Sequence, residues 1–195
     1  MNYLAHLLLS NYHEDILIGN FITDFITKPQ EKDFDAKIQV GIQLHRMIDE
    51  FTDDHKIVKE GLSRLRKHQG KYAPVVLDIC YDHLLARNWN KYSDVHIDLF
   101  APHTYKQLES HYDILPKKLM KSLPAMIKGN WLMSYEHRSG LEYTFERLTK
   151  RVKFENSLPN AVEDFYKDYD FYEAGFLKFF PELQEMSRVF CELNV

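Results

Sequence analysis

Residues 41–53 read GIQLHRMIDEFTD, and this stretch predicts an α-helix with a polar stripe along one side. Apolar side chains recur through it and just before it at helical intervals: Phe34, Ile38, Ile42, Met47, Ile48 and Phe51. This spacing is typical of an amphipathic helix, which we expect to end near Asp53. His45 and Asp49 are four residues apart, so they share one face of that helix, and Asp53 extends the face by one turn.

Helical periodicity continues on both sides of this stretch. After His55 it predicts a helix through Val58, Leu62 and Leu65, and Pro74 suits the first turn of another. Further helices are expected around 105–112, 117–127 and 141–154 and from 158 to the end, with starts or kinks at Pro102, Pro116, Pro124, Pro159 and Pro181. No run alternates as a strand does, and only 14 residues are Gly or Pro, which is few for many hairpins. The sequence therefore predicts one all-α domain over residues 1–195, with about seven to ten helices of ordinary length.

Composition excludes several classes of protein. The chain is 45% apolar and 28% charged, as globular domains usually are. A net charge of -4 and a pI near 6.2 argue against broad nucleic-acid binding. Residues 1–10 lack the basic start of a signal peptide, and their apolar run is too short to span a membrane, so we expect a cytoplasmic protein.

Polar residues on the helix over 41–53 could carry chemistry. An imidazole nitrogen of His45 and a carboxylate oxygen of Asp49, one turn apart, can ligate one metal ion or support each other. The alternative is a solvated polar face, since such pairs are common on protein surfaces.

Asp78 and Asp82 lie four residues apart in a second segment, DICYDHLLARNW over 78–89. The surrounding residues are strongly apolar, so we expect a core helix. A carboxylate there is costly unless it is paired, protonated or bound to metal. The alternative to a metal site is a buried pair with Arg46 or Arg87.

His6 and Asp24 are polar residues in apolar surroundings near the N-terminus, within YLAHLLL over 3–9 and GNFITDF over 19–25. Each has a plain alternative: His6 as a hydrogen-bonded core histidine, and Asp24 as a helix cap or a buried pair. The neighbours of Asp24 predict a largely dry site, where its charge would need a strong partner. Taken together, these histidines and aspartates suit hydrolysis assisted by Mn²⁺, Fe²⁺, Zn²⁺ or Mg²⁺. The GxxxxGK(S/T), GxGxxG, GxSxG and HExxH motifs of other enzyme classes are absent.

Four ordered motifs carry a resemblance to a known family. They are MNYLAHL at 1–7, GNF at 19–21 with Asp24, GIQLHRMID at 41–49 with Thr52 and Asp53, and DHLLARNW at 82–89. Their succession resembles the acyl carrier protein phosphodiesterases, also called acyl carrier protein hydrolases. FFP at 179–181 fits as well, less specifically.

The resemblance implies a divergent member of the HD phosphohydrolase superfamily, with an all-α fold. It implies hydrolysis of the phosphodiester that joins 4′-phosphopantetheine to a serine of holo acyl carrier protein, with Mn²⁺, in fatty acid biosynthesis. The predicted metal ligands are His6, Asp24, His45 and Asp82. The predicted catalytic residues are Asp49, as a ligand or proton carrier, His83, as the proton donor to the leaving serine, and Arg46, which would hold phosphate oxygens. The chain departs from the wider superfamily because it has no adjacent His-Asp pair, only Asp54-His55 and Asp82-His83 in reversed order.

Acyl carrier proteins are small and acidic in this family picture, so an acidic enzyme needs a local basic patch to meet them. The predicted patch is Arg64, Arg66, Lys67 and Lys71, with Lys117, Lys118 and Lys121 as the second choice. Two rival functions stay open. One is an HD-type hydrolase of a small nucleotide or phosphoester. The other is a helical protein-binding module whose histidines and aspartates form only a buried polar network.

Overall fold

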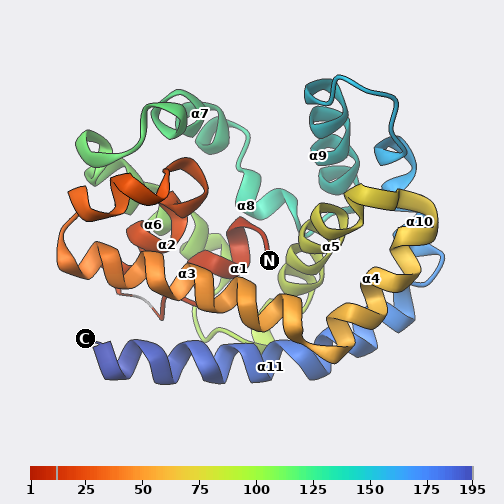
Figure 1. Ribbon diagram of the computed structural model, residues 1–195, viewed down its shortest axis with the longest axis horizontal. Helices are drawn as coiled ribbons and strands as arrows, with labels where there is room; N and C mark the ends of the chain where they lie inside the picture. Colours follow the sequence, from red (N-terminus) through yellow and green to blue (C-terminus); the bar gives the residue numbers. More distant parts are fainter. Residues whose placement is uncertain (12, 195) are drawn as a thin grey trace.

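The structure is a computed structural model that describes residues 1–11 and 13–194, and these residues form helices and no strands (Figure 1). The all-α prediction is confirmed. The described part contains eleven α-helices, with short 3-10 turns between them: α1 Tyr3–Leu8, α2 Glu14–Ile22, α3 Ala36–Asp54, α4 Lys56–Gln69, α5 Ala73–Arg87, α6 Ile97–Ser110, α7 Lys117–Lys128, α8 Trp131–Ser134, α9 Arg138–Arg151, α10 Ala161–Tyr166 and α11 Tyr169–Asn194. The count exceeds the predicted range because α1, α8 and α10 are only four to six residues long. Within the described ranges, no helix is both long and apolar enough to cross a membrane.

Some of the prolines in the sequence mark helix starts, and others lie inside helices. Pro74 lies in the first turn of α5, as predicted, and Pro116 directly precedes α7. Three other prolines do not start helices, since they lie inside α6, α7 and α11: Pro102, Pro124 and Pro181. The helix expected from 158 onward is two helices, α10 and α11, which meet near 167–168.

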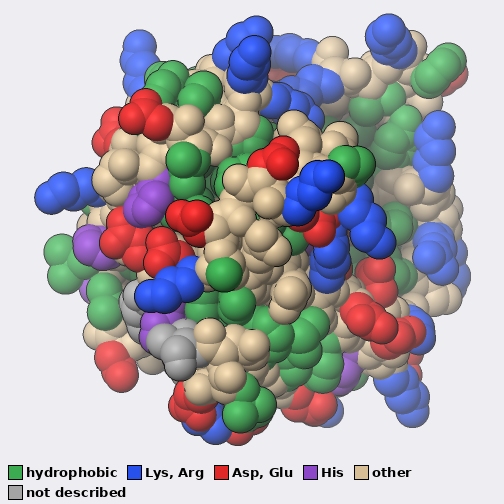
Figure 2. Space-filling model, turned by 60° about the vertical axis from the view of Figure 1, so that its left-hand side comes forward, with side chains coloured by type: hydrophobic (Ala, Val, Ile, Leu, Met, Phe, Trp, Pro, Cys, Tyr) green, Lys and Arg blue, Asp and Glu red, His purple; other side chains and the backbone are tan. Residues whose placement is uncertain are grey.

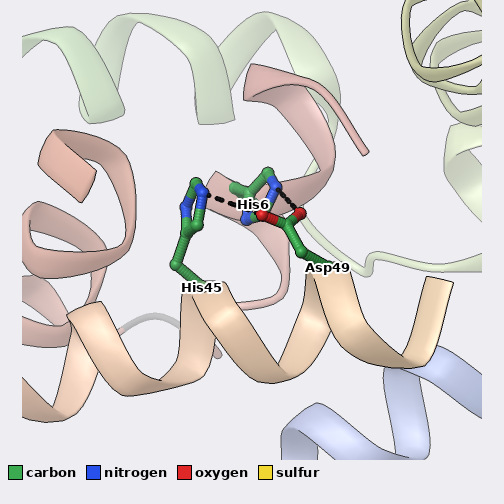
Figure 3. Close-up of side chains that lie close together, drawn as sticks. All are labelled: His6, His45 and Asp49. Carbon is green, nitrogen blue, oxygen red and sulfur yellow. Dashed lines mark ion pairs between the residues drawn. The ribbon is translucent and has the colours of Figure 1, made fainter. Parts of the chain in front are cut away.

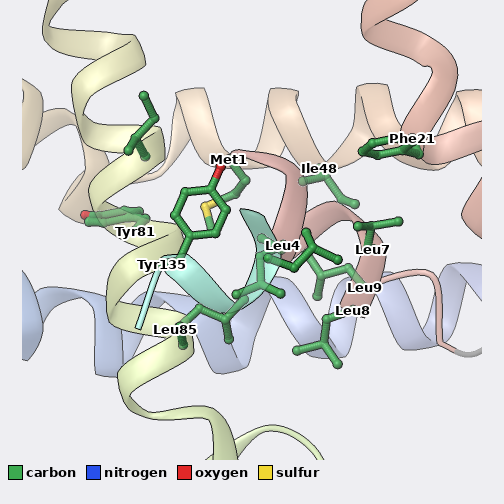
Figure 4. Packing of buried hydrophobic residues seen from close by; sticks show 14 of the residues in the cluster. Met1, Leu4, Leu7, Leu8, Leu9, Phe21, Ile48, Tyr81, Leu85 and Tyr135 are labelled. Carbon is green, nitrogen blue, oxygen red and sulfur yellow. The ribbon is translucent and has the colours of Figure 1, made fainter. Parts of the chain in front are cut away.

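Helix α5 runs through the centre of the molecule. It is apolar on all sides and buried over most of its length, which is typical of a core helix. Leu84 and Leu85 are fully buried, and Tyr81 packs on Phe176 of α11 with ring centroids 5.4 Å apart. The leucines of α1 pack beside it (Figure 4). The short α1 therefore lies between α5 and α2.

Helices α2 and α3 pack unusually close together, and two glycines permit it. A Cβ atom on Gly19 would lie 2.0 Å from the carbonyl oxygen of Ile38, and one on Gly41 would lie 2.2 Å from that of Ile16. Both gaps are far shorter than a van der Waals contact, so neither position tolerates a side chain. The close approach brings Asn20 of α2 against His45 of α3.

Candidate metal centre

Two helices, α1 with His6 and α3 with His45 and Asp49, bring these three residues together beside the N-terminus of the chain (Figure 3). One ligand atom from each residue lies within 4.8 Å of the other two. His6 Nε2 is 3.3 Å from Asp49 Oδ1, and His45 Nε2 is 3.2 Å from Asp49 Oδ2. The two imidazole rings stack with centroids 4.0 Å apart. Both histidines are buried, whereas the side chain of Asp49 is 46% exposed, so the cluster is open to solvent on its carboxylate side.

Asn20 orients both imidazoles. His6 Nδ1 donates to the side-chain oxygen of Asn20 at 2.8 Å, and His45 Nδ1 donates to its backbone carbonyl at 2.7 Å. The Asn20 amide nitrogen in turn donates to the carbonyl of His6 at 2.7 Å and to Ser10 at 3.0 Å. Because Nδ1 of each ring is used as a donor, Nε2 is the atom that each ring presents to Asp49. Metal-binding histidines in proteins are commonly held in this way. Sequence reasoning missed this role, although a buried amide inside the apolar run 16–22 was a signal for it.

Asp24 lies at the edge of the cluster, on the 3-10 turn Thr23–Phe25 that follows α2. Its Oδ1 is 3.5 Å from His45 Nε2. The prediction of a dry site for Asp24 is wrong, because its side chain is 56% exposed. Phe21 and Ile22 point into the core, but the turn directs Asp24 outward. Asp24 is therefore placed to reach a ligand bound on the open side of the cluster.

Electrostatics in the metal-free cluster favour one proton on His45. Burial opposes its charge, but hydrogen bonds to Asp24 and Asp49 outweigh burial and raise the pKa of His45 to about 9. Burial would raise the pKa of Asp49 and of Asp24, yet the hydrogen bonds from the histidines lower both. For His6, burial and the charge of His45 lower the pKa. A protonated His45 thus neutralises part of the acidic charge, and a divalent cation would replace that proton.

Asp82 of α5 lies outside the cluster, and its side chain contacts the first turn of α1. It is fully buried, and its two oxygens accept hydrogen bonds from the backbone N–H groups of Leu4, at 2.7 Å, and Ala5, at 3.2 Å. These contacts satisfy N–H groups that a helix leaves free at its N-terminus. Burial raises the pKa of Asp82 to about 7 in spite of them. The ligand role of Asp82 stays a prediction, and the geometry assigns it the positioning of the helix that carries His6.

His83 has both ring nitrogens engaged away from the cluster. Nδ1 donates to the carbonyl of Tyr135 at 2.6 Å, and Nε2 lies 3.1 Å from the hydroxyl of Tyr166. Burial lowers its pKa. Its predicted role as a proton donor stays a prediction, and these contacts place it among the aromatic side chains of α10 and α11.

Arg46 and Asp78 have partners that the sequence did not indicate. Arg46 forms an ion pair with Glu31 on the exposed side of α3. Asp78 lies 3.2 Å from the amino group of Met1. The alternative in which Arg46 or Arg87 neutralises a buried aspartate of α5 is therefore wrong for Asp82, which is held by backbone N–H groups.

The two predicted basic patches differ in their relation to the cluster. In the first, Arg64 pairs with Asp168 at 3.1 Å and lies 3.8 Å over the ring of Phe171. In the second, Lys118 of α7 lies 5.7 Å from the ring centroid of Phe25, the residue after Asp24. Figure 2 shows Lys and Arg side chains gathered along the upper part of one face, at the height of α7 and α9 in Figure 1. The second patch thus contacts Phe25, the residue next to Asp24 at the edge of the cluster.

Comparison with known proteins gives a consistent result. Residues 1–183 match the model of a family described as acyl carrier protein phosphodiesterase. A protein of that name from Photorhabdus laumondii is 29% identical over 186 residues, which cover 95% of this chain and 94% of that protein. Proteins of the same name from Klebsiella pneumoniae and Escherichia coli are 28% identical over 188 residues, which cover 96% of this chain and 97% of each. No solved structure matches the chain.

Proposed function

The chain belongs to the acyl carrier protein phosphodiesterase family, and from this membership we propose that it hydrolyses the phosphodiester linking 4′-phosphopantetheine to a serine of holo acyl carrier protein. The products are apo acyl carrier protein and free 4′-phosphopantetheine. The observation that carries the proposal is the half-open cluster of His6, His45 and Asp49 inside the family-matched region. We also propose a cytoplasmic location and membership of the HD superfamily.

A divalent cation fits this cluster. The two Nε2 atoms and the Asp49 carboxylate are mutually close, and the imidazoles are fixed from behind by Asn20. A mixed nitrogen and oxygen set of this kind suits Mn²⁺, which we propose, and also Fe²⁺, Zn²⁺ or Mg²⁺. Such an ion, when bound, polarises a phosphoryl oxygen and makes a nearby water a stronger nucleophile.

The chain's own residues supply the rest of the proposed mechanism. His6 and His45 hold the cation through Nε2, and Asp49 holds it through a carboxylate oxygen. Asp24, exposed on its turn and 3.5 Å from His45, is placed to bind the ion, or to take a proton from the attacking water and pass it to the serine oxygen released when the P–O bond breaks. Asp82 keeps α1 in register, so that His6 stays beside His45.

Recognition of an acidic carrier protein requires positive charge close to the cluster. We propose that Lys117, Lys118 and Lys121 of α7 provide it, because Lys118 contacts Phe25 beside Asp24. The patch of Arg64, Arg66, Lys67 and Lys71 is the competing proposal. Reversing Lys118 and Lys121 to Glu should raise KM several-fold and flatten its salt dependence. The matched reversal of Arg64 and Arg66 should change KM less, and the opposite ranking would favour the first patch.

The activity test compares substrates. Purified chain loaded with Mn²⁺ is incubated with holo acyl carrier protein, and mass spectrometry follows loss of the phosphopantetheine group. We expect complete conversion to the apo form and no phosphate release from nucleotides. A His45→Ala variant should be inactive, whereas His103→Ala, an exposed histidine on α6, should match the wild type. Nucleotide hydrolysis without conversion of holo acyl carrier protein would favour the small-phosphoester rival. Absence of both bound metal and activity would favour the binding module.

A further inference from the structure

A cavity of about 140 Å³ lies between α1, α5, α8 and α9, and the proposed function leaves it unassigned. Its walls are mixed. Val75, Ile79 and Trp131 supply apolar surface, while Tyr3, Arg147 and Arg151 supply polar groups. Apolar walls with a few convergent polar groups are the lining that ligand sites usually have.

No ion pair of the described residues includes either arginine of this cavity, and the same holds for Arg66 and Arg87, which do not line it. Four other arginines of the chain do have a carboxylate partner: Arg46, Arg64, Arg138 and Arg188. Arg147 and Arg151 are one turn apart on α9, and the guanidinium of Arg147 lies 3.5 Å over the ring of Trp131. Burial and the like charge of Arg151 lower the pKa of Arg147. Two like charges side by side, one of them fixed on an aromatic ring, favour an anionic ligand.

Tyr3 connects this cavity to the metal centre. It lines the cavity, and it lies on α1 one turn before His6. Its ring stacks on Phe25, the residue after Asp24, with centroids 6.2 Å apart. After burial, the charge of Asp24 raises the pKa of the Tyr3 hydroxyl, whereas Arg151 and Arg147 lower it. The hydroxyl is thus within electrostatic reach of both the acidic edge of the cluster and the two arginines.

We propose that this cavity binds the phosphate end of the phosphopantetheine group, an inference that rests on the proposed function. The phosphate lies against Arg147 and Arg151, on the side of the cavity that Tyr3 lines. The dimethyl carbon, which one CH₂ group separates from the phosphate ester oxygen, packs on Val75, Ile79 and Trp131. A guanidinium fork matches a phosphate better than an ammonium does, and the apolar wall matches a branched alkyl group. The same site holds the released 4′-phosphopantetheine.

The test measures binding without turnover. Isothermal titration of the metal-free chain, kept in chelator, compares 4′-phosphopantetheine, pantetheine and inorganic phosphate. Removing the metal ensures that coordination of phosphate to an ion does not contribute. The wild type should bind 4′-phosphopantetheine at least about tenfold more tightly than either of the other two, because it alone engages both the arginines and the apolar wall. Arg147→Gln and Arg151→Gln should reduce its preference over pantetheine to near unity.

Lys150→Gln is the matched control, since Lys150 lies between the two arginines on α9 and pairs with Glu146 on the surface. It should leave all three affinities unchanged. Arg147→Lys keeps the charge and the fold but loses the planar fork, so its preference should be intermediate. The inference is overturned if the wild type binds 4′-phosphopantetheine and pantetheine equally. It is also overturned if inorganic phosphate binds as tightly as 4′-phosphopantetheine, or if the arginine variants keep the wild-type preference.

Hydrolysis of holo acyl carrier protein, measured separately, distinguishes the two claims. Turnover with unchanged KM in Arg147→Gln and Arg151→Gln would support the proposed function. It would also show that the cavity does not bind the substrate. An arginine-dependent preference for 4′-phosphopantetheine in a chain that does not hydrolyse holo acyl carrier protein would support the cavity and overturn the proposed function.

Discussion

Two pairs of histidine and aspartate residues, each within one helix, have opposite surroundings. His45 and Asp49 on α3 face His6, and the open side of their cluster meets solvent. Asp82 and His83 on α5 are fully buried, and backbone groups or a tyrosine hydroxyl already engage their polar atoms. The two pairs differ in whether their polar atoms are already hydrogen-bonded within the protein. A group can bind a ligand only when the protein itself leaves its lone pairs available.

The comparison also shows how the two pairs depend on each other. Asp82 holds the first N–H groups of α1, and α1 carries His6 into the cluster. One pair is proposed to act on the substrate, and the other holds the scaffold. Substitutions in the two regions should therefore affect different measurements.

Asp49→Asn should have the largest effect. It keeps the shape of the side chain but removes the charge that both imidazoles face. Activity toward holo acyl carrier protein should fall by several orders of magnitude, and bound Mn²⁺, measured by atomic emission, should be lost. The melting temperature should stay within a few degrees of the wild type. A variant with full activity and metal content would place the centre elsewhere.

Asp82→Ala should show the opposite pattern. It leaves two buried N–H groups without partners, which should lower the free energy of unfolding by about 2–4 kcal/mol. Asp82→Asn, which can still accept one hydrogen bond, should cost about 0.5–2 kcal/mol. Urea denaturation measures both. Below the unfolding transition, Asp82→Asn should still bind metal. Loss of metal with unchanged stability would instead make Asp82 a ligand.

Asn20→Ala tests whether the Asn20 side chain orients His6 for metal binding. It removes the side-chain acceptor of His6 but leaves the backbone carbonyl that His45 uses. Metal affinity should fall by about 10–100-fold, as for other partners that orient metal ligands. Competitive titration with a chelating dye measures it. Ser10→Ala removes a contact of Asn20 that does not touch either imidazole, so it should change the affinity less.

A smaller, graded effect should follow pH. The pKa of His45 is raised to about 9, so its ion pairs stabilise the metal-free fold fully below pH 6.5. That contribution is lost as the pH rises through about 9. Over the same range metal no longer has to displace a proton, so the apparent affinity for Mn²⁺ should rise by up to about tenfold per pH unit. An affinity independent of pH between 6.5 and 9 would contradict the charge assignment of His45.

The sequence correctly predicted the helical class and the shared helix face of His45 and Asp49, because both depend on local periodicity. It also identified His6 and Asp24 as unusual polar residues. It missed Asn20, whose role comes from the close packing of α2 and α3 at Gly19 and Gly41. A contact between helices is invisible to spacing along one helix.

The prediction that Asp24 has dry surroundings was wrong for a similar reason. Apolar neighbours in sequence do not show that a 3-10 turn will direct the side chain outward. Asp82 and the residues of the cluster were likewise indistinguishable from spacing alone. Only the three-dimensional contacts show which carboxylate is already occupied by backbone N–H groups.

The most direct test of the central claim is the position of the metal itself. Crystals of the chain grown with Mn²⁺ would give an anomalous scattering peak that locates the ion. We expect a peak within coordination distance of Nε2 of His6, Nε2 of His45 and a carboxylate oxygen of Asp49, and none beside Asp82. A peak next to Asp82 or His83, or none at the His6–His45–Asp49 cluster at saturating Mn²⁺, would contradict it.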